Sequence, residues 1–143
     1  DTLPRMMGFQ AAGAAPFVAD AFVDNPETVA SAICIGKPAS WQPAKAALQF
    51  SAGAIDKVTD EEILTAYQMI TAQEGIFVEP ASAAALAGII KLQNAGKIDE
   101  GSIVVATMTG HGLKDPDNAV EHANVEATTV EPNLDSVRAA IGL

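Results

Sequence analysis

Residues 54–63, AIDKVTDEEI, place a predicted strand directly before the start of a predicted helix. The first five of these residues alternate as a half-buried strand does. Thr59 and Glu62 form a capping box, because the threonine hydroxyl and the glutamate carboxylate can each accept a backbone N–H at a helix start. Apolar residues then recur at helical spacing from Ile63 to Ile70, and Gly75 ends the pattern. This stretch therefore predicts one unit of strand followed by helix.

Similar units lie on both sides of this stretch. Before it, the sequence predicts a strand over residues 6–10, a small-residue turn over 11–16, a short helix over 17–22, a helix beginning at 25–27 and a helix over 41–50 capped by Ser40. After it, the sequence predicts a strand over 76–78, an alanine-rich helix over 83–94, a strand over 102–107 and a closing helix from Asn133. Such alternation is typical of right-handed crossovers and a parallel sheet. We therefore expect an α/β fold, a three-layer sandwich with a mostly parallel sheet.

The composition is typical of one globular domain. The 143 residues are 49% hydrophobic and 18% charged, which is enough for a hydrophobic core. A net charge of −10 would repel nucleic-acid phosphates and anionic lipids, and no apolar run approaches the roughly 20 residues of a membrane-spanning helix. We therefore expect no nucleic-acid or membrane partner. Cys34 is the only cysteine, so no intrachain disulfide can form, and we expect a cytoplasmic protein.

Three small-residue loops follow the predicted strands, at residues 10–15, 79–83 and 109–112. Ligands of open α/β sheets bind beyond the carboxyl ends of the strands, so these loops form the candidate site. In TGHG, residues 109–112, the Thr109 hydroxyl stands between a strand end and two glycines, which would let backbone approach a flat or anionic ligand. A tight turn without function is the alternative for these four residues.

Other polar residues near these loops also have structural alternatives. Glu79 can accept backbone amides at the start of the next helix, and Ser82 is expected more as an N-cap than as a ligand contact. His111 could act as a general base, but no second histidine lies at ligand spacing, and we expect no metal site. Residues 115–121 contain three acidic residues but lack the glycine of an EF-hand loop, so we expect these acids to be solvated. Hydrolase, Walker and dinucleotide-binding motifs do not occur.

Five segments of the chain, in this order and spacing, resemble the carboxy-terminal part of the threonine synthases: residues 7–16 (MGFQAAGAAP), 35–41 (IGKPASW), 58–63 (VTDEEI), 74–84 (EGIFVEPASAA) and 109–116 (TGHGLKDP). The resemblance implies a pyridoxal-phosphate enzyme of fold type II, similar to tryptophan synthase β and threonine dehydratase. Such an enzyme converts O-phosphohomoserine and water into threonine and phosphate. By the same resemblance, residues 1–118 would be part of the cofactor-binding domain, and residues 119–143 a linker and a carboxy-terminal helix.

The resemblance also implies roles for individual residues. Thr109 would face the pyridine nitrogen of the cofactor with a neutral hydroxyl, where other pyridoxal enzymes place a carboxylate. The other residues that the resemblance places around the cofactor are Gly110, Ala12, Gly13, Glu79 and Ser82. None of the six lysines lies in a context like that of the lysine that forms the Schiff base in this family. We therefore expect no catalytic residue within this chain, an amino-terminal half that is missing from it, and no activity of the chain alone.

Two alternatives stay open. Another fold type II lyase, such as a threonine or serine dehydratase, would share the architecture and often has serine at the position of Thr109. A non-catalytic assembly module would explain the missing lysine. Within the threonine synthase interpretation we expect a homo-oligomer, a dimer, and the small-molecule substrate O-phosphohomoserine. A sheet cut at its edge would also expose an unpaired strand, which favours self-association.

Overall fold

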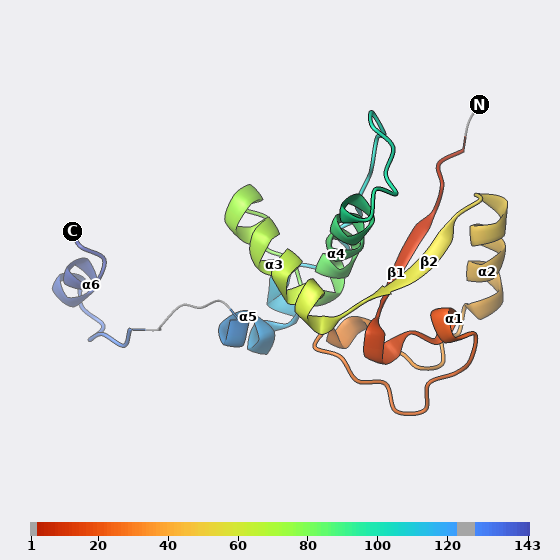
Figure 1. Ribbon diagram of the computed structural model, residues 1–143. Helices are drawn as coiled ribbons and strands as arrows, with labels where there is room; N and C mark the ends of the chain where they lie inside the picture. Colours follow the sequence, from red (N-terminus) through yellow and green to blue (C-terminus); the bar gives the residue numbers. More distant parts are fainter. Residues whose placement is uncertain (1–2, 123–127) are drawn as a thin grey trace.

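A computed structural model describes residues 3–122 and 128–143 of the chain (Figure 1). Its strands and helices are β1 (Met7–Ala11), α1 (Pro16–Ala19), α2 (Trp41–Phe50), β2 (Ala54–Val58), α3 (Asp60–Glu74), α4 (Pro80–Asn94), α5 (Pro116–His122) and α6 (Leu134–Ala140). Short 3-10 turns lie at η1 (Ala12–Ala14), η2 (Ser31–Ile33) and η3 (Gly112–Lys114). No helix of these residues is long and apolar enough to cross a membrane.

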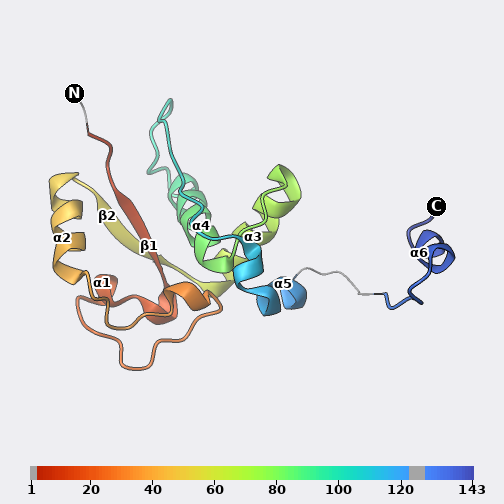
Figure 2. The same ribbon diagram turned by 180° about the vertical axis from the view of Figure 1, so that it is seen from behind.

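Strands β1 and β2 form a two-stranded parallel sheet. Met7 pairs with Ala54 at one end of the register, and Ala11 pairs with Val58 at the other. Helices α3 and α4 pack against each other on one side of the strands, and α2 lies on the other side in both views (Figures 1 and 2). The expected α/β class, with a parallel sheet between helices, is confirmed.

Helix α3 begins and ends as its sequence predicts. The Glu62 amide donates to Thr59 Oγ1 at 3.1 Å, and the Thr59 amide donates to Glu62 Oε2 at 2.7 Å, so both halves of the capping box are formed. Gly75 ends the helix with φ at +67°, a left-handed conformation that glycine adopts without a steric penalty. The predicted apolar stripe, Ile63 to Ile70, is the buried face of α3.

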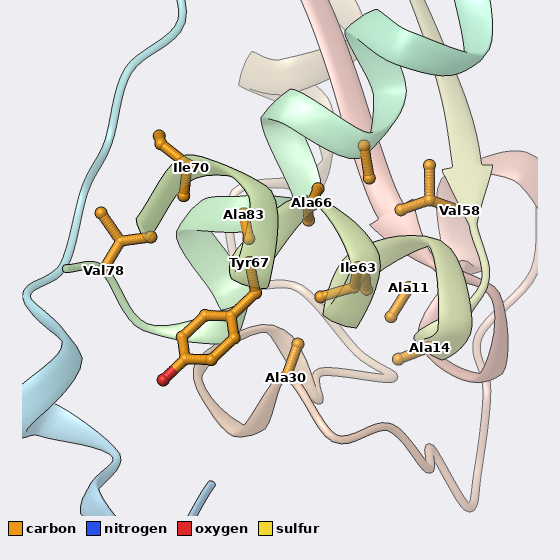
Figure 3. Packing of buried hydrophobic residues seen from close by; sticks show 12 residues of the cluster. Ala11, Ala14, Ala30, Val58, Ile63, Ala66, Tyr67, Ile70, Val78 and Ala83 are labelled. Atoms are coloured by element: carbon orange, nitrogen blue, oxygen red, sulfur yellow. The ribbon is translucent and has the colours of Figure 1, made fainter. Parts of the chain in front are cut away.

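The core lies between the sheet, α3 and α4 and is built mostly from small residues (Figure 3). Its members are Ala11, Ala14, Ala30, Val58, Ile63, Ala66, Tyr67, Ile70, Val78, Ala83, Ala84 and Ala87. Small side chains allow the elements to approach closely. At Gly88 of α4, an added Cβ would lie 2.2 Å from Cγ of Phe9 on β1, so the absence of a side chain lets the Phe9 ring sit directly on the helix.

Two expected strands are wrong. In residues 76–78, Val78 alone pairs, in an isolated antiparallel bridge with His111. Residues 102–107 form no strand, and Ile103 and Val105 are 94% and 84% exposed. A strand needs a neighbour to accept and donate its ladder hydrogen bonds. In the described part of the chain, nothing supplies that neighbour for residues 102–107.

The helix expected from Asn25 is also wrong. The Asp60 carboxylate at the start of α3 accepts hydrogen bonds from the Thr28 hydroxyl and from the Val29 amide, the latter at 3.1 Å. These bonds hold the segment in an irregular conformation that ends in the η2 turn. The helix expected over 17–22 is shorter in the structure. Helix α1 ends at Ala19, because Asp20 after it adopts a left-handed conformation with φ at +49°. Helix α2 has the expected bounds, although the Ser40 side chain makes no capping bond.

Candidate functional site

The candidate site lies where residues 109–114 meet the start of α4. The Glu79 amide donates to the Gly110 carbonyl at 3.0 Å, and the Gly112 amide donates to the Phe77 carbonyl at 3.2 Å. These two bonds flank the bridge between Val78 and His111. Although the two segments are distant in sequence, the pairing holds the TGHG run against the residues that lead into α4.

A pair of hydroxyls forms the centre of this contact. Ser82 Oγ accepts from the Gly110 amide at 2.8 Å and lies 3.1 Å from Thr109 Oγ1. Ser82 is 1% exposed, whereas Thr109 is exposed. The serine hydroxyl can donate either to Thr109 or to the Gly110 carbonyl at 3.3 Å. Thr109 can therefore donate a hydrogen bond to a ligand while it accepts one from Ser82, or accept a hydrogen bond from a ligand while it donates one to Ser82.

The structure corrects the expected role of Ser82. Helix α4 begins at Pro80, with Glu79 at the N-cap position, and the Ser82 backbone N–H donates to the Glu79 carbonyl. The serine hydroxyl makes no capping bond and is directed to the TGHG run instead. The sequence favoured a cap because Ser82 lies in the first turn of the expected helix. The partners that its hydroxyl binds lie 27 and 28 residues away, and no local pattern indicates them.

Glu79 is buried beside Gly110 and is paired with Lys114. Its residue exposure is 4%, and its Oε1 accepts from Lys114 Nζ at 3.1 Å. The expectation that this carboxylate caps backbone amides of α4 is wrong, since no such side-chain bond forms. A Cβ at Gly110 would lie 1.9 Å from Glu79 Oε1, so only glycine allows the carboxylate to approach this backbone. Lys114 is the residue that sequence reasoning missed.

The turn at Ala12 and Gly13 lies elsewhere along the carboxyl edge of the sheet. Both residues are exposed and belong to η1, directly after β1. Gly13 contacts Glu27: its carbonyl accepts from the Glu27 amide at 3.1 Å, and a Cβ on it would lie 2.0 Å from the Glu27 carbonyl oxygen. The structure thus brings Glu79, Ser82, Thr109 and Gly110 together, whereas Gly13 contacts Glu27 and none of these four residues.

His111 has a structural role. Its Nδ1 accepts from the Leu113 amide at 3.2 Å, and its ring lies edge-on to Phe77 at 5.5 Å. One ring nitrogen is therefore occupied at the start of η3, which gives no support to a general base. Among the described residues, no group of three or more metal-binding side chains lies together.

Asp115 departs from the expectation that the acids after TGHG are solvated. Burial raises the pKa of Asp115, but hydrogen bonds from the Ser31 hydroxyl and from Asn118 outweigh it and hold the pKa below the ordinary value of 3.8. Asn118 Nδ2 also donates to the Val29 carbonyl at 3.0 Å. The chain after the candidate site is thereby anchored to the segment that Asp60 holds.

Comparison with known sequences adds two findings to this geometry. The family described as "Pyridoxal-phosphate dependent enzyme" matches residues 1–110. The threonine synthase of Synechocystis is 50% identical over 143 residues, which cover 99% of this chain and 37% of the relative. That of Mycobacterium leprae is 56% identical over 121 residues, which cover 85% of this chain and 34% of the relative. The resemblance predicted from the five motif segments is confirmed, and the chain spans little more than a third of these relatives' length.

Solved structures show a similar fold. O-ureido-L-serine synthase, solved as a mutant with O-ureido-L-serine bound, matches with a TM-score of 0.65 at 13% identity, over 97% of this chain and 39% of that chain. An L-serine ammonia-lyase from Rhizomucor miehei matches with a TM-score of 0.59 at 18% identity, over 84% of this chain and 41% of that chain. At these identities the likeness shows the fold alone.

Proposed function

The chain belongs to the family of pyridoxal-phosphate-dependent enzymes, and on that premise we propose that it forms the carboxy-terminal part of a threonine synthase. The whole enzyme would convert O-phosphohomoserine and water into threonine and phosphate. The observation that carries this proposal is the 50% identity to the Synechocystis threonine synthase across 99% of the chain. The hydroxyl pair at Ser82 and Thr109 also supports it, because these side chains could bind the cofactor.

The residues of the candidate site fit one edge of a pyridoxal ring. Thr109 presents an exposed, neutral hydroxyl, and the buried Ser82 hydroxyl supports it whether it donates or accepts. We propose that Thr109 binds the ring nitrogen, and that the Gly110 backbone, whose amide donates to Ser82 Oγ, contacts the ring edge beside it. The nearby Glu79 carboxylate is neutralised by Lys114, so it does not force a proton onto that nitrogen.

The cofactor, when bound, would supply an electron-withdrawing ring that stabilises negative charge on substrate carbons. A neutral partner at the ring nitrogen makes that ring a weaker electron sink than a carboxylate partner does. The enzyme would then depend on holding the substrate and the proton-transferring groups in position. Thr109 contributes to this by fixing the orientation of the ring at a single atom.

Ala12 and Gly13 are proposed as a second contact of the cofactor. They lie exposed at the carboxyl end of β1, which is the edge of the sheet where ligands bind in open α/β folds. Their small side chains would let a flat ring approach the backbone.

We propose residues 1–118 as part of the cofactor-binding domain and residues 119–143 as a linker with a carboxy-terminal helix. The threonine synthase would be a cytoplasmic homodimer that acts on a small molecule and binds neither nucleic acid nor membrane. The net charge of −10 supports the last two points. Light scattering of the purified enzyme tests the dimer directly.

Reconstitution tests the proposed activity. This chain would be mixed with a separate polypeptide that carries the remainder of the Synechocystis threonine synthase, together with pyridoxal phosphate and O-phosphohomoserine. Because this chain lacks a lysine in the context of the Schiff-base lysine, we expect no phosphate release from the chain alone and release of phosphate with threonine from the mixture. A chain with Thr109→Val serves as the matched control.

The product separates the alternatives. Threonine and phosphate from O-phosphohomoserine support the synthase, whereas no reaction of that substrate together with a 2-oxo acid and ammonia from added serine or threonine would assign a dehydratase instead. A folded, associated mixture that releases neither product would reject the enzyme proposal and favour a non-catalytic module.

A further inference from the structure

We propose that Lys114 and Glu79 act as a positioning pair that holds the Thr109–Gly110 turn against the start of α4. The inference rests on the proposed function in one respect, namely that the Thr109 hydroxyl binds the cofactor ring. Lys114 would touch neither cofactor nor substrate and would act through Glu79. Three observations carry the proposal: the burial of Glu79, its contact with Gly110, and the place of Lys114 just beyond the turn.

The burial of Glu79 makes a positive partner necessary. Its side chain is 5% exposed, and Lys114 Nζ at 3.1 Å is its side-chain hydrogen-bond partner among the described residues. Removing one member of a buried ion pair leaves an uncompensated charge, which is strongly destabilising. Lys114 itself is 59% exposed, so its ammonium stays partly in water while it compensates the carboxylate. The pair therefore bears the desolvation cost of one ion and not of two.

The contact between Glu79 and Gly110 couples the ion pair to the hydroxyls. Glu79 Oε1 fills the space where a Cβ of Gly110 would stand, at 1.9 Å. A carboxylate that turned away toward water would open this space beside Gly110. Gly110 in turn donates to Ser82 Oγ at 2.8 Å, and Ser82 lies 3.1 Å from the Thr109 hydroxyl. The direction of the Thr109 hydroxyl thus depends on where the Glu79 carboxylate lies.

Lys114 provides a further contact between the chain after the TGHG run and the start of α4. It is the last residue of the η3 turn, which begins at Gly112, the residue whose amide makes the last backbone bond between the TGHG run and the chain before α4. Three contacts hold residues 110–114 against the chain before α4. The Glu79 amide binds the Gly110 carbonyl, the Gly112 amide binds the Phe77 carbonyl, and Lys114 pairs with the Glu79 carboxylate. The segment before it, residues 102–107, is exposed and lacks strand pairing, so it adds little support from the other side.

A single-chain chimera provides the test. This chain would replace the matching 143 residues of the Synechocystis threonine synthase. The variants are Lys114→Met, which removes the charge and keeps the length, and Lys114→Arg, which keeps the charge. The matched control is Lys91→Met in α4, the helix that Glu79 precedes, and it removes a pair with Asp56 at 2.9 Å and a bond to the Lys57 carbonyl.

The first readout needs no cofactor. Hydrogen exchange of the Gly110 and Gly112 amides in the cofactor-free chimera should become about tenfold faster in Lys114→Met, because local opening exposes both bonds. In Lys91→Met and Lys114→Arg these rates should stay within about twofold of the parent. Equal rates in Lys114→Met and in the parent would overturn the proposal, even if the chimera bound no cofactor at all.

The second readout connects the pair to the cofactor. The dissociation constant for pyridoxal phosphate should rise about tenfold in Lys114→Met and recover in Lys114→Arg, as for a hydrogen bond to a charged group. The cofactor absorption maximum should shift in Lys114→Met alone. A parent chimera that binds no cofactor would reject the proposed function. A parent that binds, with Lys114→Met indistinguishable from Lys91→Met, would reject the positioning pair.

Discussion

Two β-branched stretches of this chain have opposite fates. In β2 and the following helix, Val58 and Ile63 are 1% and 0% exposed, because β1 pairs with β2 and α4 packs against α3. In residues 102–107, Ile103 and Val105 are 94% and 84% exposed. The exposed stretch is the more apolar of the two, since β2 contains Asp56 and Lys57, so apolar composition does not explain which stretch is buried. The difference is whether a partner is present to pair with the backbone and cover the side chains.

The comparison explains where the candidate site gains its order. The TGHG run follows the unpaired stretch, so it is held from the other side, by the residues around the start of α4. Side-chain contacts replace the sheet there: Ser82 to Gly110 and Lys114 to Glu79. A turn that follows an unpaired segment can therefore be held in place when a helix start provides its contacts.

The variant with the greatest expected loss of stability changes a buried residue of α3. Ile63→Ala removes a fully buried side chain and should lower the free energy of unfolding by about 3 kcal/mol. Ile103→Ala makes the same chemical change at an exposed position and should alter it by less than about 0.5 kcal/mol. Urea unfolding of the chain measures both. Similar losses for the two variants would show that residues 102–107 are covered in solution.

A second variant tests the close approach of α4 to β1. Gly88→Ala would place a Cβ 2.2 Å from the Phe9 ring and should cost about 2 kcal/mol, although alanine favours a helix. Gln93→Ala, on the exposed part of the same helix, is the control and should be neutral or slightly stabilising. A stabilised Gly88→Ala would mean that the helix does not lie on Phe9.

A third pair of variants separates local signals from those that need a neighbour. Thr59→Ala removes a formed cap and should cost about 1 kcal/mol. Ser40→Ala, at the N-cap position of α2, should cost almost nothing because the Ser40 side chain makes no capping bond. Thermal unfolding of both variants provides the measurement, and equal shifts in the midpoint would contradict the assignment of the capping box.

The features that the sequence predicted share this local character. The capping box and Gly75 are satisfied within one helix, the stripe from Ile63 to Ile70 is buried by the packing of α4 against it, and all three were correct. The strand over residues 102–107 and the helix from Asn25 depended on distant groups, and both were wrong. Among the described residues, no strand pairs with residues 102–107. In the segment after Asn25, the Thr28 hydroxyl and the Val29 amide bind the Asp60 carboxylate, which holds it in an irregular conformation. A local pattern is sufficient for a helix, whose hydrogen bonds close within the segment, whereas a strand pattern succeeds only where a second strand is present, as it is for β1 and β2.

The same reasoning applies to the candidate site. Thr109 and Gly110 were identified from glycines after an expected strand over residues 102–107, and although that strand does not form, the structure brings both residues to Ser82 and Glu79. The role of Lys114 was not identified, because its partner lies 35 residues earlier and the ion pair leaves no local pattern. Contacts between segments so far apart become visible only when the fold is known.

The smallest expected effect concerns pH. The pKa of Asp115 is lowered in the folded chain, so its ionised form contributes stability above the ordinary value of 3.8, and this contribution is lost as pH falls through the lowered pKa. Asp115→Asn should therefore make the loss of stability below about pH 4 shallower. Urea unfolding at pH 6, 4 and 3 measures the slope. An unchanged slope would show that Ser31 and Asn118 do not bind this carboxylate in solution.

The central claim is that this chain supplies the hydroxyl that binds the cofactor ring in a threonine synthase. The most direct measurement is phosphate release from O-phosphohomoserine by the single-chain chimera, compared between Thr109→Ser and Thr109→Val. Thr109→Ser keeps the hydroxyl and should retain activity within about tenfold, whereas Thr109→Val keeps the shape and should lose about 100-fold. Equal activity of Thr109→Val and the parent chimera would contradict the claim.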